Sequence, residues 1–132
     1  MGNWIPNDPT LVAQILKISS AYTPPPPEGF VSPMTWGIEK NVIERFAAAG
    51  IPWDKVSFDR DTFIFNYSGS PASFVNEFRM YYGPTMNAFD AAEMNGRAGE
   101  LQKELEQLFV AQNSGKDGTS IPATFLRVTV RI

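Results

Sequence analysis

The sequence predicts an α+β fold in which a small, mainly antiparallel sheet is covered by four or five helices. Three observations lead to this class. Five segments carry apolar residues at helical spacing or between helix start and stop signals. Two further segments, residues 56–67 and 124–132, are rich in strand-forming residues. The 132 residues are 43% hydrophobic and 13% aromatic, which is enough apolar material for one packed core. We therefore expect residues 1–132 to form a single domain.

The five expected helices are bounded by capping residues, glycines and prolines. They cover about residues 9–22, 38–49, 71–82, 84–94 and 97–112. Asp8 as N-cap and Pro9 at the first helical position start the first helix. It ends before the prolines at 24–27, which lack the N–H that a helix needs and are expected to form a stiff extended connector.

The third expected helix, about residues 71–82, is rich in aromatic residues. Ser70 is the expected N-cap, and the break at Gly83-Pro84 ends the helix and opens the next one. We place four aromatic residues on its apolar side: Phe74, Phe78, Tyr81 and Tyr82.

The two strand segments differ in how regularly they alternate. In residues 56–67 the apolar residues change parity across Asp59-Arg60-Asp61, which indicates either a bulge in one long bent strand or a tight turn between two short strands. We favour the single bent strand. In residues 124–132 the side chains of Leu126, Val128, Val130 and Ile132 share one face, as in a half-buried strand. Residues 115–120 are expected to form a loop.

Composition excludes several classes of function. The net charge is −3 without a basic cluster, so we expect no nucleic-acid partner. No apolar run reaches the ~20 residues of a membrane span, and the first residues lack the cationic and apolar regions of a secretory signal, so we expect neither a membrane partner nor a signal peptide in these residues. The absence of Cys fits a cytoplasmic protein, and the absence of His removes imidazole-based catalysis and the usual zinc ligands. We expect no metal site, and we interpret Asp59 and Asp61 as a turn or edge cluster.

Three segments together resemble a known family: residues 3–6 (NWIP), 22–46 (YTPPPPEGFVSPMTWGIEKNVIERF) and 78–91 (FRMYYGPTMNAFDA). They are similar to the carboxyl-terminal half of class I S-adenosylmethionine (SAM)-dependent methyltransferases of the small-molecule type. The resemblance implies that residues 1–4 are the tail of strand five, 38–49 the last crossover helix and 56–67 strand six. Residues 124–132 would be the antiparallel strand seven, and residues 68–123 a helical insertion that caps the substrate.

The resemblance does not extend to the cofactor-binding half of such enzymes. Their glycine-rich strand–turn–helix, which holds SAM, has no counterpart here, so we expect no cofactor to bind to this chain alone and name no catalytic residue. The expected function is the substrate-capping region of a methyltransferase, inactive by itself, encoded by a truncated gene or belonging to a longer protein. The alternative is a stand-alone module that binds a small ligand or forms oligomers without catalysis.

Six residues are candidates for contact with a small-molecule substrate: Trp4, Trp36, Phe78, Arg79, Tyr81 and Tyr82. The aromatic residues offer apolar area, and a tyrosine hydroxyl can orient a polar group. Each has a purely structural alternative: core packing for the three aromatic residues of the third helix, a packing anchor before a helix for Trp36, cover of the sheet edge for Trp4, and a solvated surface position for Arg79. Tyr82, next to the helix break, is the preferred pocket residue. We also expect a homodimer, because a small sheet with an open edge favours pairing with a second copy.

Overall fold

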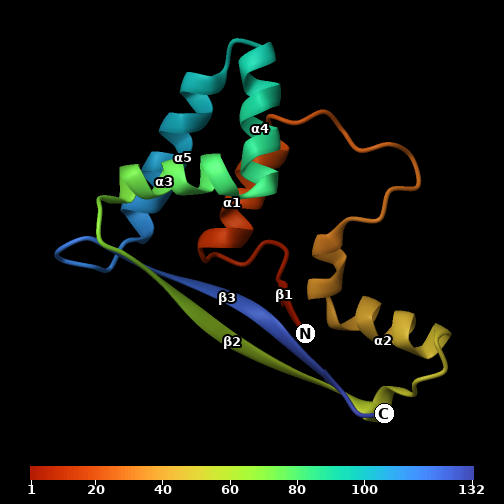
Figure 1. Ribbon diagram of the computed structural model, residues 1–132. Coiled ribbons are helices and arrows are strands. Elements are labelled where there is room, and N and C mark those ends of the chain that lie inside the picture. The colour runs from red at the N-terminus through yellow and green to blue at the C-terminus, as the bar shows by residue number, and fades with distance from the viewer.

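The computed structural model describes residues 1–132. Its longest element is an antiparallel pair of twelve-residue strands, beside which the helices pack (Figure 1). The strands are β1 (Gly2–Trp4), β2 (Val56–Tyr67) and β3 (Thr119–Val130). The α-helices are α1 (Leu11–Ser20), α2 (Glu39–Ala48), α3 (Pro71–Tyr81), α4 (Gly83–Met94) and α5 (Ala98–Gln112). Two short 3₁₀ helices, η1 (Pro33–Gly37) and η2 (Trp53–Lys55), complete the fold. The predicted α+β class is confirmed.

The sheet has the order β1-β3-β2, and β3 is antiparallel to both neighbours. β2 is one continuous strand, as we favoured, but the expected bulge is wrong. Its register against β3 runs unbroken from Val56 opposite Val130 to Tyr67 opposite Thr119. The change of parity therefore has a different cause.

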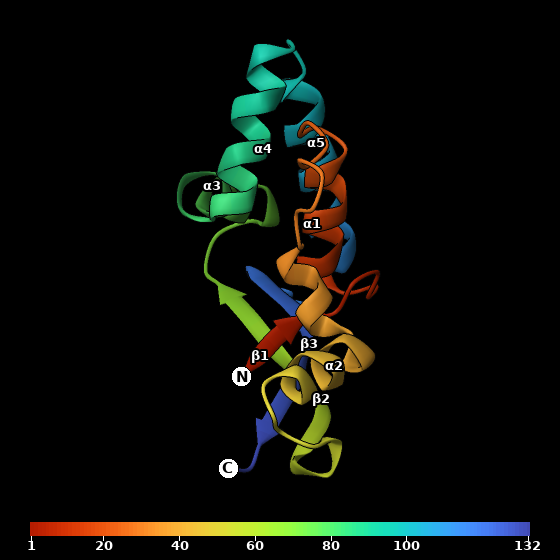
Figure 2. The ribbon, with the colours of Figure 1, turned by 90° about the vertical axis from the view of Figure 1, so that its right-hand side faces the viewer.

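The two ends of the β2–β3 ribbon bury opposite faces. Successive side chains of a strand point to opposite sides, so a change of parity without a bulge means a change of buried face. On β3, Ile121 and Ala123 belong to the core cluster formed with α1, α3, α4 and α5. Leu126 and Val128 instead pack with Val42 of α2 in a second, smaller cluster. Figures 1 and 2 show α1 and α3–α5 gathered at one end of the ribbon and α2 beside the other.

The last strand begins earlier than predicted. β3 starts at Thr119, inside the expected loop, and ends at Val130, while Ile132 is fully exposed. Pro122 lies in this middle strand at a position where only β2 runs beside it, because β1 pairs with residues 125–127 alone. A proline without a backbone donor is tolerated at such a locally open edge.

Two helix starts test the capping predictions. α3 begins as expected, with the hydroxyl of Ser70 accepting a 3.1 Å hydrogen bond from the backbone N–H of Ser73. The prediction for α1 is wrong, since Thr10 rather than Asp8 is its N-cap. The Asp8 carboxylate instead accepts hydrogen bonds from the backbone N–H, at 3.0 Å, and the hydroxyl of Thr10. It orders the turn just before the helix.

Tyr81 is not on the apolar side of α3, contrary to expectation. Phe74 is 9% exposed and Val75 is completely buried, so the buried stripe of the helix is centred between them. Tyr81 falls at the margin of that stripe in the last turn and is 73% exposed.

Candidate functional site

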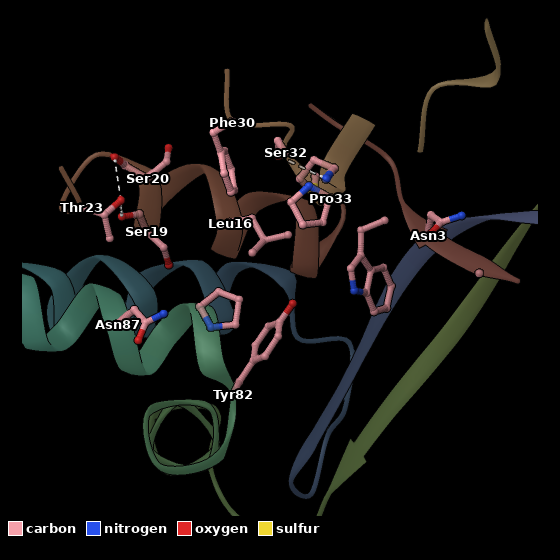
Figure 3. Close-up of a pocket in the computed structure, with 14 residues that line it drawn as sticks. Asn3, Leu16, Ser19, Ser20, Thr23, Phe30, Ser32, Pro33, Tyr82 and Asn87 are labelled. Atoms are coloured by element: carbon pink, nitrogen blue, oxygen red, sulfur yellow. Dashed lines mark hydrogen bonds between the residues drawn. The ribbon is translucent and has the colours of Figure 1, made fainter. Parts of the chain in front are cut away.

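A cavity of about 620 Å³ opens where β1, α1, η1 and the α3–α4 junction meet (Figure 3). Its fourteen lining residues are Gly2, Asn3, Trp4, Leu16, Ser19, Ser20, Thr23, Phe30, Ser32, Pro33, Met34, Tyr82, Pro84 and Asn87. The volume lies within the range of small-molecule sites. The residues come from parts of the chain more than 80 positions apart, and the fold alone brings them together.

Trp4 forms one apolar wall of the cavity. It is the last residue of β1 and stands opposite Phe125 of β3 in the sheet register. The two rings meet edge to face with centroids 6.2 Å apart. This pairing fixes the indole at the carboxyl end of β1.

Tyr82 enters the cavity from the break between α3 and α4. It is the C-cap of one helix and the N-cap of the other, with an extended backbone (φ −98°, ψ 114°). Its ring packs edge to face on Phe78 at 5.5 Å, and Figure 3 shows its hydroxyl pointing toward α1. Burial raises the pKa of the Tyr82 hydroxyl, and the nearby indole of Trp4 acts in the opposite direction.

The hydroxyl of Ser19 is buried without a partner. Ser19 is 4% exposed, and its Oγ makes no hydrogen bond. The neighbouring hydroxyl of Ser20 donates to the carbonyl of Lys17 at 2.7 Å. Figure 3 shows the Ser19 side chain directed from α1 toward α4, which carries Asn87 on the cavity wall. A buried hydroxyl without a partner costs free energy, so this is a polar position that a bound group could satisfy.

The cavity has no charged lining residue, and Tyr82 is its only side chain with an ionisable group. No group of acidic, histidine or cysteine side chains in the structure could hold a metal ion. The site can therefore bind and orient a molecule through apolar contacts and hydrogen bonds. It has no general base that is poised near neutral pH.

The structure brings two of the six predicted contact residues, Trp4 and Tyr82, to this cavity. Phe78 lies beside Tyr82 and packs against the main core, with its ring 5.4 Å from that of Phe109. Tyr81 points outward at 73% exposure. Tyr82 follows Phe78 by four residues and packs on it, so it continues the buried side of the helix, whereas Tyr81 lies about 100° further round the helix.

The other two predicted residues have structural partners elsewhere. Trp36 packs edge to face on Phe46 at 6.1 Å, under the guanidinium of Arg45 at 4.5 Å. Arg79 forms a 3.0 Å ion pair with Glu93 and lies over the ring of Phe89 at 4.1 Å. Neither lines the cavity.

Sequence reasoning missed most of the polar lining. Ser19 occupies a position on the apolar stripe of α1, and a serine on such a stripe was the available signal. Asn87 and Phe30 carried no signal, because only the packing of α4 and of the segment before η1 brings them to α1.

A second depression lies on the sheet beside β1. We call it the aromatic hollow; it measures about 390 Å³ and is lined by Gly2, Trp4, Phe63, Phe65 and Phe125. Phe63 is 54% exposed there. The outer edge of β1 pairs with no strand, so an apolar surface and an open strand edge adjoin.

The fold and the site define an α+β protein with an uncharged cavity of about 620 Å³ beside an antiparallel sheet. No known protein-family model matches the chain, and no curated protein or solved structure matches it either. No helix of the structure combines the length and apolar character needed to cross a membrane.

Proposed function

We propose that this chain is the substrate-capping, carboxyl-terminal region of a SAM-dependent methyltransferase that acts on a small organic molecule. The observation that carries the proposal is the strand order β1-β3-β2 with β3 antiparallel to both neighbours. The family that the sequence resembles ends its sheet with strand six and an antiparallel strand seven inserted beside it. In this proposal β1, β2 and β3 would be strands five, six and seven of that arrangement.

The position of the cavity also supports the proposal. Residues between β2 and β3 form α3, α4 and α5, the segment that the resemblance implies to be a substrate cap. Tyr82 reaches from this segment toward Trp4 at the carboxyl end of β1. A ligand between them would be covered by the cap and would lie at the end of the sheet where such enzymes carry out their chemistry.

In this role the chain contributes binding and orientation. The cofactor of a complete enzyme supplies the methyl group, while the protein positions the accepting atom and excludes water. The uncharged cavity suits that division, since Trp4 and Tyr82 can hold an acceptor by packing and hydrogen bonding.

Two measurements test the proposal: calorimetric titration of the chain with SAM, and the sequence of the DNA that precedes the codon for Met1. The chain alone should show no saturable SAM binding at about 100 μM, since that affinity corresponds to ~5.5 kcal/mol and needs a formed cofactor site. The DNA before the codon for Met1 should encode, in frame, a strand followed by a glycine-rich turn. The protein that includes it should bind SAM and transfer its methyl group to a small acceptor. Tight SAM binding by the chain alone, or a genuine start site at Met1, would contradict the proposal.

The second candidate is a stand-alone module that binds a small ligand or self-associates without catalysis. The observation in its favour is that residues of this chain alone supply all fourteen lining residues of the cavity. A genuine start site at Met1, together with ligand binding by the isolated chain, would favour this function.

A further inference from the structure

The charge of the cavity wall restricts what can bind there. None of its fourteen lining residues is Lys, Arg, Asp or Glu. An ionised ligand would lose water on entry without gaining a partner of opposite charge, and that loss is much larger than the loss for a neutral polar group. The wall therefore selects against carboxylates, phosphates and ammonium groups.

The polar atoms of the wall require a ligand with its own hydrogen-bonding group. The Ser19 hydroxyl is 4% exposed by residue and has no partner in the protein. The Tyr82 hydroxyl also lines the cavity, and a phenol O–H can donate its proton in a hydrogen bond. A carbonyl, ether or hydroxyl oxygen on the ligand could accept that proton.

The remaining wall is apolar and provides flat contact area. Leu16 lies on α1, Phe30 approaches from the segment before η1 and Pro33 from the start of η1, as Figure 3 shows. The indole of Trp4 lines the same space. Aromatic and aliphatic side chains of this kind hold a ring or a short hydrocarbon by burial.

We infer that the cavity binds an uncharged molecule that combines an apolar ring or chain with an oxygen acceptor, such as a phenol, an amide or an ester. The inference rests on the proposed function, because it names the substrate class of the same cavity. The acceptor bonds to Tyr82, and a polar group of the ligand satisfies Ser19.

Two matched sets of probes test the inference on the isolated chain. The first set is benzamide, benzoate and benzylamine, and the second is indoleacetamide, indoleacetate and tryptamine. Binding is followed by NMR, through the indole N–H of Trp4 and the backbone N–H of Ser19. In each set the neutral amide should bind at least about tenfold more tightly than the anion and the cation.

Two variants separate a contact with the ligand from an effect on folding. Ser19→Ala removes the unpartnered hydroxyl and should weaken amide binding roughly three- to tenfold, the loss of one hydrogen bond, while leaving the denaturation midpoint unchanged or raised. Thr85→Val is the matched control. Thr85 is completely buried and also has an unpartnered hydroxyl, but it does not line the cavity, so its variant should bind the amides normally.

The outcomes distinguish this inference from the methyltransferase proposal. Equal binding of the amide, the anion and the cation, or normal amide binding by Ser19→Ala, would overturn the inference and leave the cavity as a site. No response at Trp4 or Ser19 to either set would overturn the inference and count against the cavity as a substrate site. Selective amide binding by a chain with a genuine start at Met1 would support the inference and contradict the methyltransferase role.

Discussion

Replacing Gly37 with alanine should destabilise the protein by forcing η1 away from β1. Gly37 is buried at the end of η1, and a Cβ atom there would stand 2.0 Å from the carbonyl oxygen of Trp4. It would also lie 2.9 Å from the carbonyl carbon of Trp4 and 3.0 Å from the Cα of Ile5. All three are backbone atoms, so no side-chain rotation relieves the overlap.

The size of the effect follows from how firmly β1 is held. A carbon and an oxygen in contact normally lie ~3.3 Å apart, so the two segments must separate by roughly 1 Å. β1 resists this movement because Met1 and Val128 exchange backbone hydrogen bonds of 2.7 and 2.8 Å. Overpacking costs about 1–3 kcal/mol in general, and we expect Gly37→Ala to cost about 3 kcal/mol because the obstacle is backbone.

Urea denaturation measures this cost. With a slope of about 2 kcal/mol per molar, the loss corresponds to a midpoint lowered by roughly 1.5 M. Gly99→Ala is the matched control, since Gly99 lies in the first turn of α5 and a Cβ atom there would meet no atom within 4 Å. It should stabilise the protein by about 0.5–1 kcal/mol, because alanine favours helix over glycine. A Gly37→Ala variant as stable as the wild type would refute the close packing of η1 on β1.

The core, a buried tyrosine and the sheet edge give three further predictions. Phe109 is 0% exposed and Tyr81 is 73% exposed. Phe109→Ala should therefore lower the free energy of unfolding by about 3–5 kcal/mol, whereas Tyr81→Ala should change it by less than about 0.5 kcal/mol. Equal losses in urea melts would contradict the placement of Phe109 in the core and Tyr81 on the surface. The 2.7 Å hydrogen bond from Tyr22 to Glu104, with burial, raises the pKa of Tyr22 from 10.0 to about 12. The stability that the Tyr22 hydroxyl contributes is complete below pH 10.0 and is lost as the pH rises through about 12. Tyr22→Phe should therefore remove the fall of the urea midpoint over this pH range. An unchanged profile would count against the hydrogen bond from Tyr22 to Glu104. The chain should form a dimer through the aromatic hollow and the open edge of β1, which sedimentation equilibrium would disprove by finding only a species of 14.7 kDa.

The sequence by itself determined the class of the fold and the order of its elements. Local signals were sufficient because they act within a few residues. Ser70-Pro71 caps and starts α3, and Gly83-Pro84 opens α4 immediately after Tyr82. Tyr82 was found as a cavity residue for the same reason, since the break beside it can be read directly from the chain.

Tertiary structure decided which face of each element is buried. The parity change in β2 suggested a bulge, but the ribbon keeps its register and packs opposite faces against two separate clusters. Tyr81 has the spacing of a core residue and is exposed, because the burial of Val75 moves the stripe of α3 away from it. The cavity could not be read from the chain either. Ser19 and Trp4 meet there only because long-range packing sets α1 beside the end of β1, and no local pattern records that arrangement.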